Sequence, residues 1–411
     1  MFNRLMLAIM EHIGETMSKS QIKKPELPYH RIVVKLGTSL LTGGGDRLDE
    51  AMMSGLVDQV AKLHALGVEI ILVSSGAIAS GRHKLGLTQK IKGMPYKQVL
   101  AAVGQSGLMH TYEQLFGRHN IVVAQALMTK SDLSDRHGYL NARNTLLALM
   151  ELGVICVVNE NDVVSIDEIK EAKFGDNDNL SAMVANLVDA DMLMMLTDIG
   201  GLYTADPHID PAARLIPVVR KIDTGIKRLG AAPTSNVGTG GMITKIEAAE
   251  KATDAGVRVV IANGREPDII FRLASGEPVG THFLPTSSKI ESRKRWMISG
   301  LCTRGKLVLD AGAARALREQ NRSLLAAGIL TVEGRFGRGD IVAIYDEAGT
   351  QLGCGIANYS SADIGVIKGS RSGEIAGLLS VDYGPEVVHR NNFALLEREE
   401  PGEHRQTVSV H

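Results

Sequence analysis

The sequence predicts an α/β fold, in which helices cover both faces of a mainly parallel sheet, followed by a smaller β-rich unit. Three observations carry this prediction. Short β-branched or apolar runs recur along the first part of the chain, helix-period stretches that end in glycine lie between them, and the composition changes after Pro285. Strands that alternate with helices are typical of parallel sheets covered on both faces. At 411 residues, the chain is long enough for about two to three domains.

Six segments are predicted as strands of the large sheet, because each is short, apolar and followed in most cases by glycine or small polar residues. They span 32–36, 69–73, 121–124, 154–158, 192–196 and 258–262. Helical spacing of apolar residues predicts one helix that ends before Gly67 and another that ends before Gly256. Ligands of such sheets bind beyond the carboxyl ends of the strands. The segments selected by this rule are KLGTS (35–39), SSGA (74–77), NEND (159–162) and TDIGG (197–201).

Composition argues against several classes of protein. The 45 Lys and Arg residues nearly balance the 46 Asp and Glu residues, so no nucleic-acid or membrane footprint is expected over the whole chain. Cys156, Cys302 and Cys354 are far apart and form no CxxC pair, which disfavours a zinc site and a disulfide framework. No apolar run reaches the length of a signal peptide or a membrane span. The expected compartment is a reducing cytoplasm.

Two lysines on glycine-flanked turns suggest a site that holds a polyphosphate. Lys35 leads into Gly37, and Lys245 closes the cluster GTGGMITK at 238–245. Glycine lets backbone N–H groups approach anionic oxygens, a helix start adds its positive dipole end, and lysine adds a mobile charge. Neither segment matches the Walker pattern or GxGxxG, and each alone is equally well explained as a loop with a solvated charge. Their combination predicts a site for a nucleoside triphosphate.

The segment GDNDNLSA (175–182) places four Asp or Asn side chains directly before an apolar helical run. One such side chain is enough to cap a helix, so four exceed that structural need. Together with NEND, they form a polar cluster able to hold an ammonium group, orient lysines or ligate Mg²⁺. The spacing does not fit an EF-hand.

These motifs, in this order, resemble the amino acid kinase family, and within it the members that phosphorylate glutamate. The resemblance covers about residues 31–392, and its other segments are VVKLGTS (33–39), SSGAIASG (74–81) and TDIGGLYTADP (197–207). It implies transfer of the γ-phosphoryl group of ATP to the side-chain carboxylate of L-glutamate, the first step towards proline. Because a carboxylate is already ionised at neutral pH, the reaction needs alignment and positive charge but no general base.

The resemblance also implies roles for particular residues. Lys35 and Lys245 fall on the two catalytic lysines of the family, and Asp178 on the acidic residue that orients them. The expected ATP-binding positions are Lys35, Gly37, Thr197, Asp198, Thr239, Gly240, Gly241, Met242, Ile243, Thr244 and Lys245. The expected glutamate-binding positions are Ser75, Gly76, Asp162, Asp176 and Asn177. Taken singly, Ser75 and Thr197 are better explained as turn hydroxyls.

Two of these assignments bear on the substrate and the metal. Asp162 would pair with the α-ammonium of free glutamate, a cation that N-acetylglutamate lacks. ATP is expected to act with Mg²⁺, and a contact of Asp176 or Asp178 with the metal stays an open alternative to their other roles. No metal ligand is assigned from the sequence.

The segment after Pro285 has the character of a linker into a second unit. We expect an extension at 1–27, which we predict to be flexible, a kinase domain at 28–285, a linker at 286–294, a second domain at 295–382 and a tail at 383–411. The strings GKLVLDAGAARAL (305–317) and GCGIANYSS (353–361) resemble the PUA domain, a small β-barrel-like module that often binds RNA. Residues 293–382 hold 12 Lys and Arg against 9 Asp and Glu, a net charge of only +3, with few aromatic residues. A structural or regulatory role is therefore expected rather than RNA binding.

Further expectations follow from the resemblance alone. Proline resembles a cyclised glutamate, so it is expected to inhibit at the glutamate side of the site, although the join at 165–174 is slightly longer than usual. A homo-oligomer, either a dimer or a tetramer, is also expected. The alternatives are a related kinase of aspartate, carbamate or UMP, and an RNA-binding protein whose first domain senses a nucleotide. Glutamate-dependent release of ADP would separate these alternatives.

Overall fold

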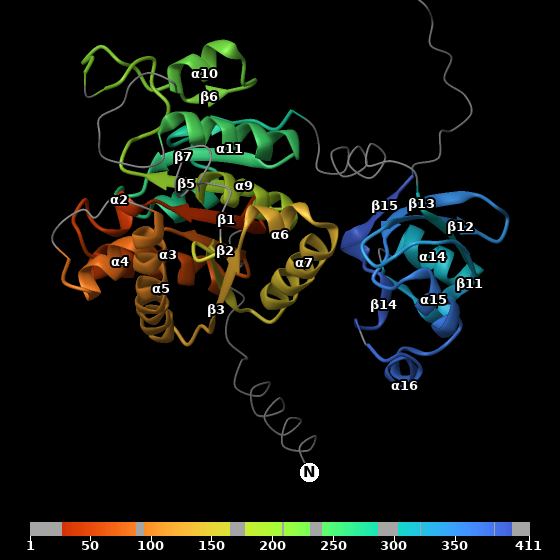
Figure 1. Cartoon of the computed structure of the whole chain (residues 1–411). Helices are drawn as coiled ribbons and strands as arrows, with labels where there is room; N and C mark the ends of the chain where they lie inside the picture. Colours follow the sequence, from red (N-terminus) through yellow and green to blue (C-terminus); the bar gives the residue numbers. More distant parts are fainter. Residues whose placement is uncertain are drawn as a thin grey trace, which may run out of the picture.

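The computed structural model describes residues 27–87, 94–164, 177–207, 209–230, 241–286, 303–320, 322–381 and 383–396. Its larger unit contains an eight-stranded sheet in the order β3-β4-β2-β1-β5-β7-β8-β6 (Figure 1). The strands are β1 (Arg31–Leu36), β2 (Glu69–Ser74), β3 (Val123–Met128), β4 (Ile155–Glu160), β5 (Met192–Thr197), β6 (Val218–Val219), β7 (Arg258–Asn263) and β8 (Thr281–Phe283). Neighbouring strands are parallel except β7 and β8, which are antiparallel. The prediction of a mainly parallel sheet is confirmed.

Helices cover both faces of this sheet. Those of the larger unit are α2 (Thr38–Leu41), α3 (Glu50–Ala65), α4 (Ala77–Lys84), α5 (Met94–Gly117), α6 (Lys130–Ser134), α7 (Arg136–Glu151), α9 (Asn177–Leu187), α10 (Thr224–Gly230), α11 (Met242–Asp254) and α12 (Ile269–Ala274). One hydrophobic core joins the sheet to α3, α5 and α12, and another joins it to α7, α9 and α11. Among the described helices, none combines the length and apolar character needed to cross a bilayer.

The central strand β1 contributes to both cores and thereby aims Lys35. Successive side chains of a strand point to opposite faces. Ile32 and Val34 lie in the core with α3 and α5, whereas Val33 lies in the core with α9 and α11. Lys35 is two residues after Val33, so it lies on the same face of the sheet. The alternation therefore directs this lysine towards the helices that carry Asp178 and Lys245.

Helices α4 and α5 approach each other closely at two glycines. A Cβ atom added at Gly104 would lie 1.8 Å from the carbonyl oxygen of Ala77, and one at Gly81 would lie 1.9 Å from that of Leu100. Backbone thus packs directly against backbone at this crossing. The contact fixes the start of α4, which follows Ser75 and Gly76.

The variant Gly104→Ala is expected to lower the free energy of unfolding by about 1–3 kcal/mol, because the added methyl group forces the two helix backbones apart. Gly117→Ala is the matched control on the same helix, since a Cβ atom there meets nothing within 4 Å. Urea unfolding of both variants measures the difference. Equal stability of the two variants would show that the crossing tolerates a wider separation.

The C-terminal unit is built from two further sheets. A five-stranded sheet has the order β11-β9-β12-β13-β15, and β10 pairs with β14. These strands are β9 (Gly305–Leu309), β10 (Leu324–Leu325), β11 (Ile329–Gly334), β12 (Ile341–Asp346), β13 (Gln351–Ile356), β14 (Glu386–Val388) and β15 (Phe393–Leu395). The helices are α14 (Ala311–Glu319), α15 (Ser361–Ile367) and α16 (Ile375–Leu378). The prediction of a strand-rich second unit is confirmed.

The sequence predicts that this unit ends at residue 382 and that a tail follows it. In the structure, β14 and β15 lie beyond that position and pair with β10 and β13, so residues 386–395 supply strands to both sheets. Residues 1–26 of the expected extension and 287–294 of the expected linker lie outside the described residues.

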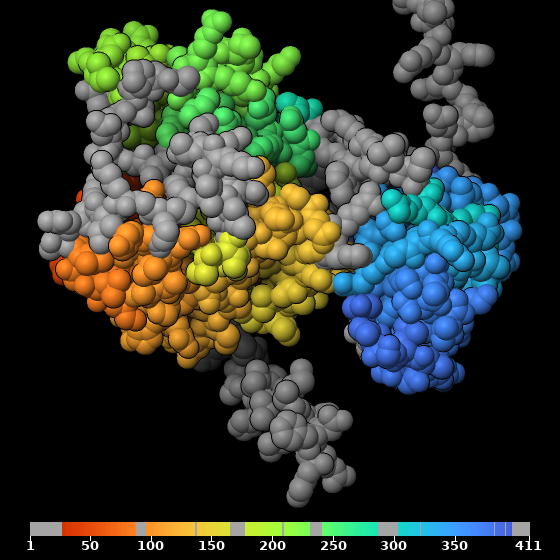
Figure 2. All heavy atoms as spheres, in the orientation of Figure 1, coloured from red at the N-terminus to blue at the C-terminus, as the bar shows by residue number. Residues whose placement is uncertain are grey.

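The C-terminal unit contacts α7 of the larger unit (Figures 1 and 2). Arg143 of α7 is 2% exposed, and its Nε atom donates to Oδ1 of Asn392 at 2.7 Å. The same guanidinium donates to the carbonyl oxygen of Leu187, the last residue of α9, and pairs with the carboxylate of Asp189. One buried side chain therefore joins the end of α9 to the C-terminal unit.

Candidate functional site

The carboxyl ends of the central strands converge at one edge of the sheet. The backbone N–H of Gly37, which follows β1, donates to the carbonyl oxygen of Leu196 in β5 at 3.3 Å. The N–H of Ser75, which follows β2, donates to the carbonyl oxygen of Leu36 at 3.2 Å. The segments expected to bind ligands from strands β1, β2 and β5 are thus hydrogen-bonded neighbours.

Lys35 and Lys245, which are 210 positions apart in the sequence, meet at a single carboxylate. The Nζ atom of Lys35 lies 2.6 Å from Oδ1 of Asp178, and that of Lys245 lies 3.3 Å from Oδ2. The side chains of Lys35, Lys245 and Asp178 are 8%, 9% and 2% exposed, respectively. We call these three residues the lysine clamp. Its geometry places two ammonium groups side by side at the ligand-binding edge of the sheet.

The protonation of the clamp reflects two cations that share one anion. Burial alone raises the pKa of Asp178, but the charges of Lys35 and Lys245 and the hydrogen bonds to this carboxylate hold it well below its usual range. The pKa of Lys245 is lowered, first by burial and also by repulsion from Lys35, although Asp178 acts in the opposite direction. The three groups together carry a net charge of +1 when all are ionised. A buried excess of positive charge fits an anionic ligand such as a phosphate group.

The start of α11 completes the phosphate side of the site. Gly241 precedes this thirteen-residue helix in an extended conformation, with no side-chain cap for the first turn. Its first-turn N–H groups and the helix dipole favour a negative charge at this end. The hydroxyl of Thr244 lies 2.8 Å from Oδ2 of Asp178 and 2.8 Å from the carbonyl oxygen of Gly241, so it holds the clamp to the helix start.

The remaining residues expected to bind ATP are placed as follows. Gly37 follows β1, and a Cβ atom there would lie 3.9 Å from Nζ of Lys35. Thr197 is buried at the end of β5, and its hydroxyl donates to the exposed Asp198 at 3.0 Å. Met242 and Ile243 are half-buried in the first turn of α11. Thr239 and Gly240 lie outside the described residues.

The acceptor side of the site is formed by Ser75, Gly76 and Asn177. The Nδ2 atom of Asn177 lies 3.2 Å from the carbonyl oxygen of Ser74 and 3.1 Å from the hydroxyl of Ser75. Gly76 has φ +99°, a left-handed conformation that favours glycine, and it leads directly into α4. Asn177 and Asp178 are consecutive residues at the start of α9, so the acceptor side adjoins the lysine clamp.

Asp162 follows β4 by two residues and is half-buried. Burial raises its pKa to about 6, and the neighbouring charge of Glu160 acts in the same direction. A carboxylate whose charge is costly when unpaired is suited to binding a cation. Asp176, the other acidic residue expected at this side, lies outside the described residues.

Two amides outside the predicted site residues join the acceptor side. Asn159, which is 2% exposed, accepts from Nδ2 of Asn177 at 3.2 Å and donates to Oε1 of Gln105 at 2.8 Å. In the sequence, Asn159 is marked only as part of the NEND cluster. Gln105 lies in the middle of α5, where no motif marks it.

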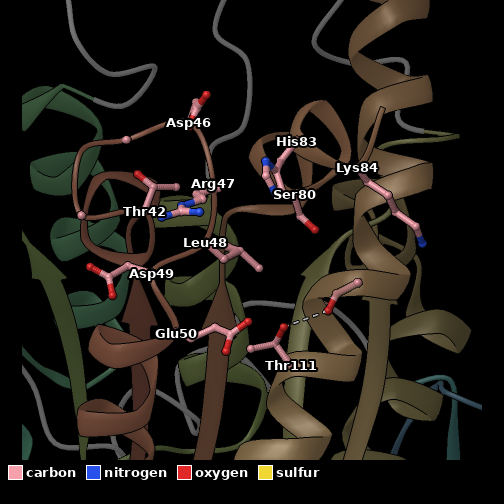
Figure 3. A pocket seen from close by; sticks show the side chains of 13 residues that line it. Thr42, Asp46, Arg47, Leu48, Asp49, Glu50, Ser80, His83, Lys84 and Thr111 are labelled. Atoms are coloured by element: carbon pink, nitrogen blue, oxygen red, sulfur yellow. Dashed lines mark hydrogen bonds between the residues drawn. The ribbon is translucent and has the colours of Figure 1, made fainter. Parts of the chain in front are cut away.

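A groove adjoins the acceptor side. Figure 3 shows side chains of residues 42–50 facing those of α4 and α5. The space that these side chains line has a volume of about 1010 Å³. Leu48 forms the wall shared with the acceptor side, since a Cβ atom at Gly76 would lie 3.1 Å from its Cδ2 atom. The exposed lining includes Arg47 and His83 as well as Asp46 and Glu50, so it has no clear preference for either sign of charge.

The described part of the chain holds no group of three His, Cys, Asp or Glu side chains arranged for a metal ion. Both carboxylate oxygens of Asp178 already contact donors. Oδ1 contacts Lys35, and Oδ2 contacts Thr244 and Lys245. This geometry favours the orienting role of Asp178 over direct contact with Mg²⁺.

Comparisons with known proteins agree with the two-part architecture. Residues 30–263 match the model of the amino acid kinase family, and residues 305–379 match that of the PUA domain. A glutamate 5-kinase of Dehalococcoides mccartyi is 60% identical over 368 residues, which cover 90% of this chain and 99% of the relative. Glutamate 5-kinases of Herpetosiphon aurantiacus and Photobacterium profundum are each 50% identical, over 88% and 90% of this chain and 97% of each relative.

The family resemblance seen in the sequence thus extends over nearly the whole length of these relatives. The family model covers more than half of the chain, and all three residues of the lysine clamp lie within the matched range, 30–263. We conclude that this chain belongs to the amino acid kinase family and carries a C-terminal PUA domain.

Proposed function

We propose that this chain transfers the γ-phosphoryl group of ATP to the side-chain carboxylate of L-glutamate, giving L-glutamyl 5-phosphate and ADP. The reaction is the one named by relatives that are 50–60% identical over about nine-tenths of the chain. The structural observation that carries the proposal is the lysine clamp, in which two buried ammonium groups share one carboxylate. It offers concentrated positive charge at the place where a phosphoryl group would move.

The chemistry follows from the charges of the reactants. A carboxylate oxygen of glutamate attacks the γ-phosphorus, a new P–O bond forms, and the bond to the β-phosphate oxygen breaks with its electrons going to ADP. No proton must be removed from the nucleophile, so the site needs no general base. Lys35 and Lys245 would stabilise negative charge on the transferring and leaving oxygens, and Asp178 would keep the two ammonium groups apart and aimed.

The acceptor would lie along Ser75, Gly76 and Asn177, with Asp162 pairing with its α-ammonium group. Mg²⁺ is usually held by substrate phosphates and one or two carboxylates, and it would neutralise charge on the nucleotide. Proline, as a cyclised analogue of glutamate, would compete at this acceptor side.

We also propose that the chain forms a homo-oligomer and works in a reducing cytoplasm. The buried free thiols Cys156 and Cys354 support the second of these proposals.

The reaction is tested by trapping the acyl phosphate. Hydroxylamine converts an acyl phosphate into a hydroxamate, so the full chain is incubated with ATP, Mg²⁺, hydroxylamine and a panel of amino acids. Hydroxamate that forms with glutamate, together with an equal amount of ADP, supports the proposal. Turnover with aspartate, carbamate or UMP in place of glutamate would favour another reaction of the family.

The raised pKa of Asp162 predicts a pH dependence of acceptor capture. Below about 6 this carboxyl becomes protonated and loses the charge that pairs with an ammonium group. We therefore expect kcat/KM for glutamate to fall by about tenfold per pH unit below that value, while KM for ATP changes little. Asp162→Asn should have a raised KM for glutamate at neutral pH and should lose this acid limb. Steady-state kinetics over the range from about pH 5 to 8 provides the measurement, and an unchanged acid limb in the variant would assign it to another group.

A further inference from the structure

Three side-chain amides form a chain from the lysine clamp towards α5, and two of them, Asn177 and Asn159, are buried, whereas Gln105 is half-buried. Asn177, which precedes Asp178, donates to Asn159, and Asn159 donates to Gln105. We call these three residues the amide chain. The amide chain begins beside the clamp and ends in α5, which packs on the other face of the sheet. A ligand bound along the amide chain would therefore place one end at the lysines and the other end away from them.

Backbone groups fix the orientation of every amide in this chain. The N–H of Glu160 donates to Oδ1 of Asn159 at 2.9 Å, so that atom must be an oxygen. The carbonyl oxygen of Ser74 accepts from Nδ2 of Asn177, so that atom must be a nitrogen. Asn159 then presents its nitrogen to Gln105, which must present its oxygen in return. No amide can be turned over without setting two like groups against each other.

This orientation leaves one donor and one acceptor unused. The Nε2 atom of Gln105 and the Oδ1 atom of Asn177 are buried, and within the described part of the chain neither has a hydrogen-bond partner. Asn177 as a whole is 7% exposed. A buried polar atom without a partner is costly and rare, so two within one hydrogen-bonded chain call for a common explanation. A ligand that supplies both missing partners would remove both costs.

The two unused atoms match the head group of an amino acid. An unused N–H donor suits a carboxylate, and an unused oxygen acceptor suits an ammonium group. The same side of the site holds Asp162, which provides the negative charge that an ammonium group prefers. Gln98 of α5 donates to the carbonyl oxygen of Val163 at 3.5 Å, so α5 runs beside the segment that carries Asp162.

We propose that Gln105 is a specificity-determining residue that donates from Nε2 to the α-carboxylate of the acceptor, while Oδ1 of Asn177 accepts from its α-ammonium group. This inference rests on the proposed function, because it names how the acceptor of that reaction is recognised. These two contacts would let the site select an acceptor with an amino acid head, whereas the lysine clamp would bind only phosphate and the reacting carboxylate.

The first test removes the whole side-chain amide of Gln105, including the oxygen that accepts from Asn159, and therefore compares two phosphoryl acceptors that both experience this loss. Gln105→Leu keeps the size of the side chain, and 4-aminobutanoate is glutamate without its α-carboxylate. We expect kcat/KM for glutamate to fall on the order of 10- to 100-fold, the usual effect of losing one hydrogen bond to a charged group. The constants for 4-aminobutanoate, measured as a substrate or as an inhibitor against glutamate, should stay within about twofold. An equal loss for both compounds, or no loss for glutamate, would overturn the proposal.

The second test introduces a negative charge at the same position. Gln105→Glu keeps an oxygen facing Asn159 but replaces the donor by a carboxylate, which repels an α-carboxylate and accepts from an α-carboxamide. The ratio of kcat/KM for glutamate to kcat/KM for isoglutamine should therefore fall by at least about tenfold. Ser106→Ala changes the next, exposed residue of α5 and should retain the wild-type preference. A variant Gln105→Glu that keeps the wild-type preference would contradict a contact between this side chain and the α-carboxylate.

Calorimetry separates a failure of this inference from a failure of the proposed function. Binding of glutamate to the full chain is measured for wild type and for Gln105→Leu, with no turnover required. A Kd raised on the order of 10- to 100-fold in the variant supports the recognition role even if no hydroxamate forms in the assay. Equal Kd values for the two proteins would overturn it even if the wild type phosphorylates glutamate.

Discussion

Replacing Lys245 by alanine is expected to lower kcat by about 10²- to 10³-fold, the usual effect of removing one group that stabilises charge in a transition state. Lys245 is 9% exposed and lies 3.3 Å from Asp178, so no solvent cation can easily take its place. Asp178 keeps its partner Lys35 at 2.6 Å, so the fold should persist. Single-turnover measurements with saturating ATP and glutamate give the loss in the chemical step itself.

Lys251→Ala is the matched control for this experiment. Lys251 lies on the same helix α11 but is exposed, and its Nζ atom contacts only the side chain of Asn179 among the contacts described for it. Its removal should leave kcat unchanged. If Lys245→Ala were to turn over at the control rate in a folded protein, Lys245 would have no part in the transfer.

Replacing Asp178 by alanine is expected to have the largest effect on stability. The change leaves two buried ammonium groups facing each other without a counter-ion, and breaking a buried ion pair from one side costs about 3–5 kcal/mol. Part of the cost will be avoided if Lys245 loses its proton, since its pKa is already lowered. Activity should fall as well, because the two ammonium groups are no longer held in position. Urea unfolding near neutral pH measures the stability, and Asn179→Ala at the next residue is the control.

The sign of the pH effect follows from the lowered pKa of Asp178. A carboxylate whose pKa is lower in the folded than in the unfolded protein stabilises the fold above its unfolded pKa of about 4, and this contribution is lost as pH falls through the folded value. Wild type should therefore lose stability on acidification in a way that Asp178→Ala does not. Parallel acid unfolding curves for the two proteins would show that the clamp carries no net stabilisation.

Most strands of the large sheet could be predicted from the sequence because they are buried on both faces. The predicted starts and ends of β1 and β7 agree with the structure to within one residue. The strand predicted at 121–124 is instead β3, Val123–Met128. This strand lies at the edge of the sheet, and its partly exposed residues, including Gln125, interrupt the apolar pattern that marks the central strands. The three-residue β8 is too short to give a pattern at all.

The residues of the candidate site could be predicted where they belong to short contiguous sequence motifs. Lys35, Asp178 and Lys245 each stand in a glycine-rich or polar segment, and strand alternation indicates the face on which they meet. Gln105 could not be found in this way, because it reaches the acceptor side only through the crossing of α4 and α5 at Gly81 and Gly104. Such a contact depends on tertiary packing, which cannot be predicted from a short segment of α5.

Arg143 links helix α9 to the C-terminal unit. Helix α9 carries Asp178 in its first turn, and its last carbonyl group accepts from the guanidinium that also reaches Asn392. Eleven helical residues form a stiff rod of about 16 Å, so a tilt imposed at one end is passed on to the other. A single helix thus connects the carboxylate that holds the two ammonium groups with the side chain that reaches the C-terminal unit, so the position of each end depends on the packing of the other.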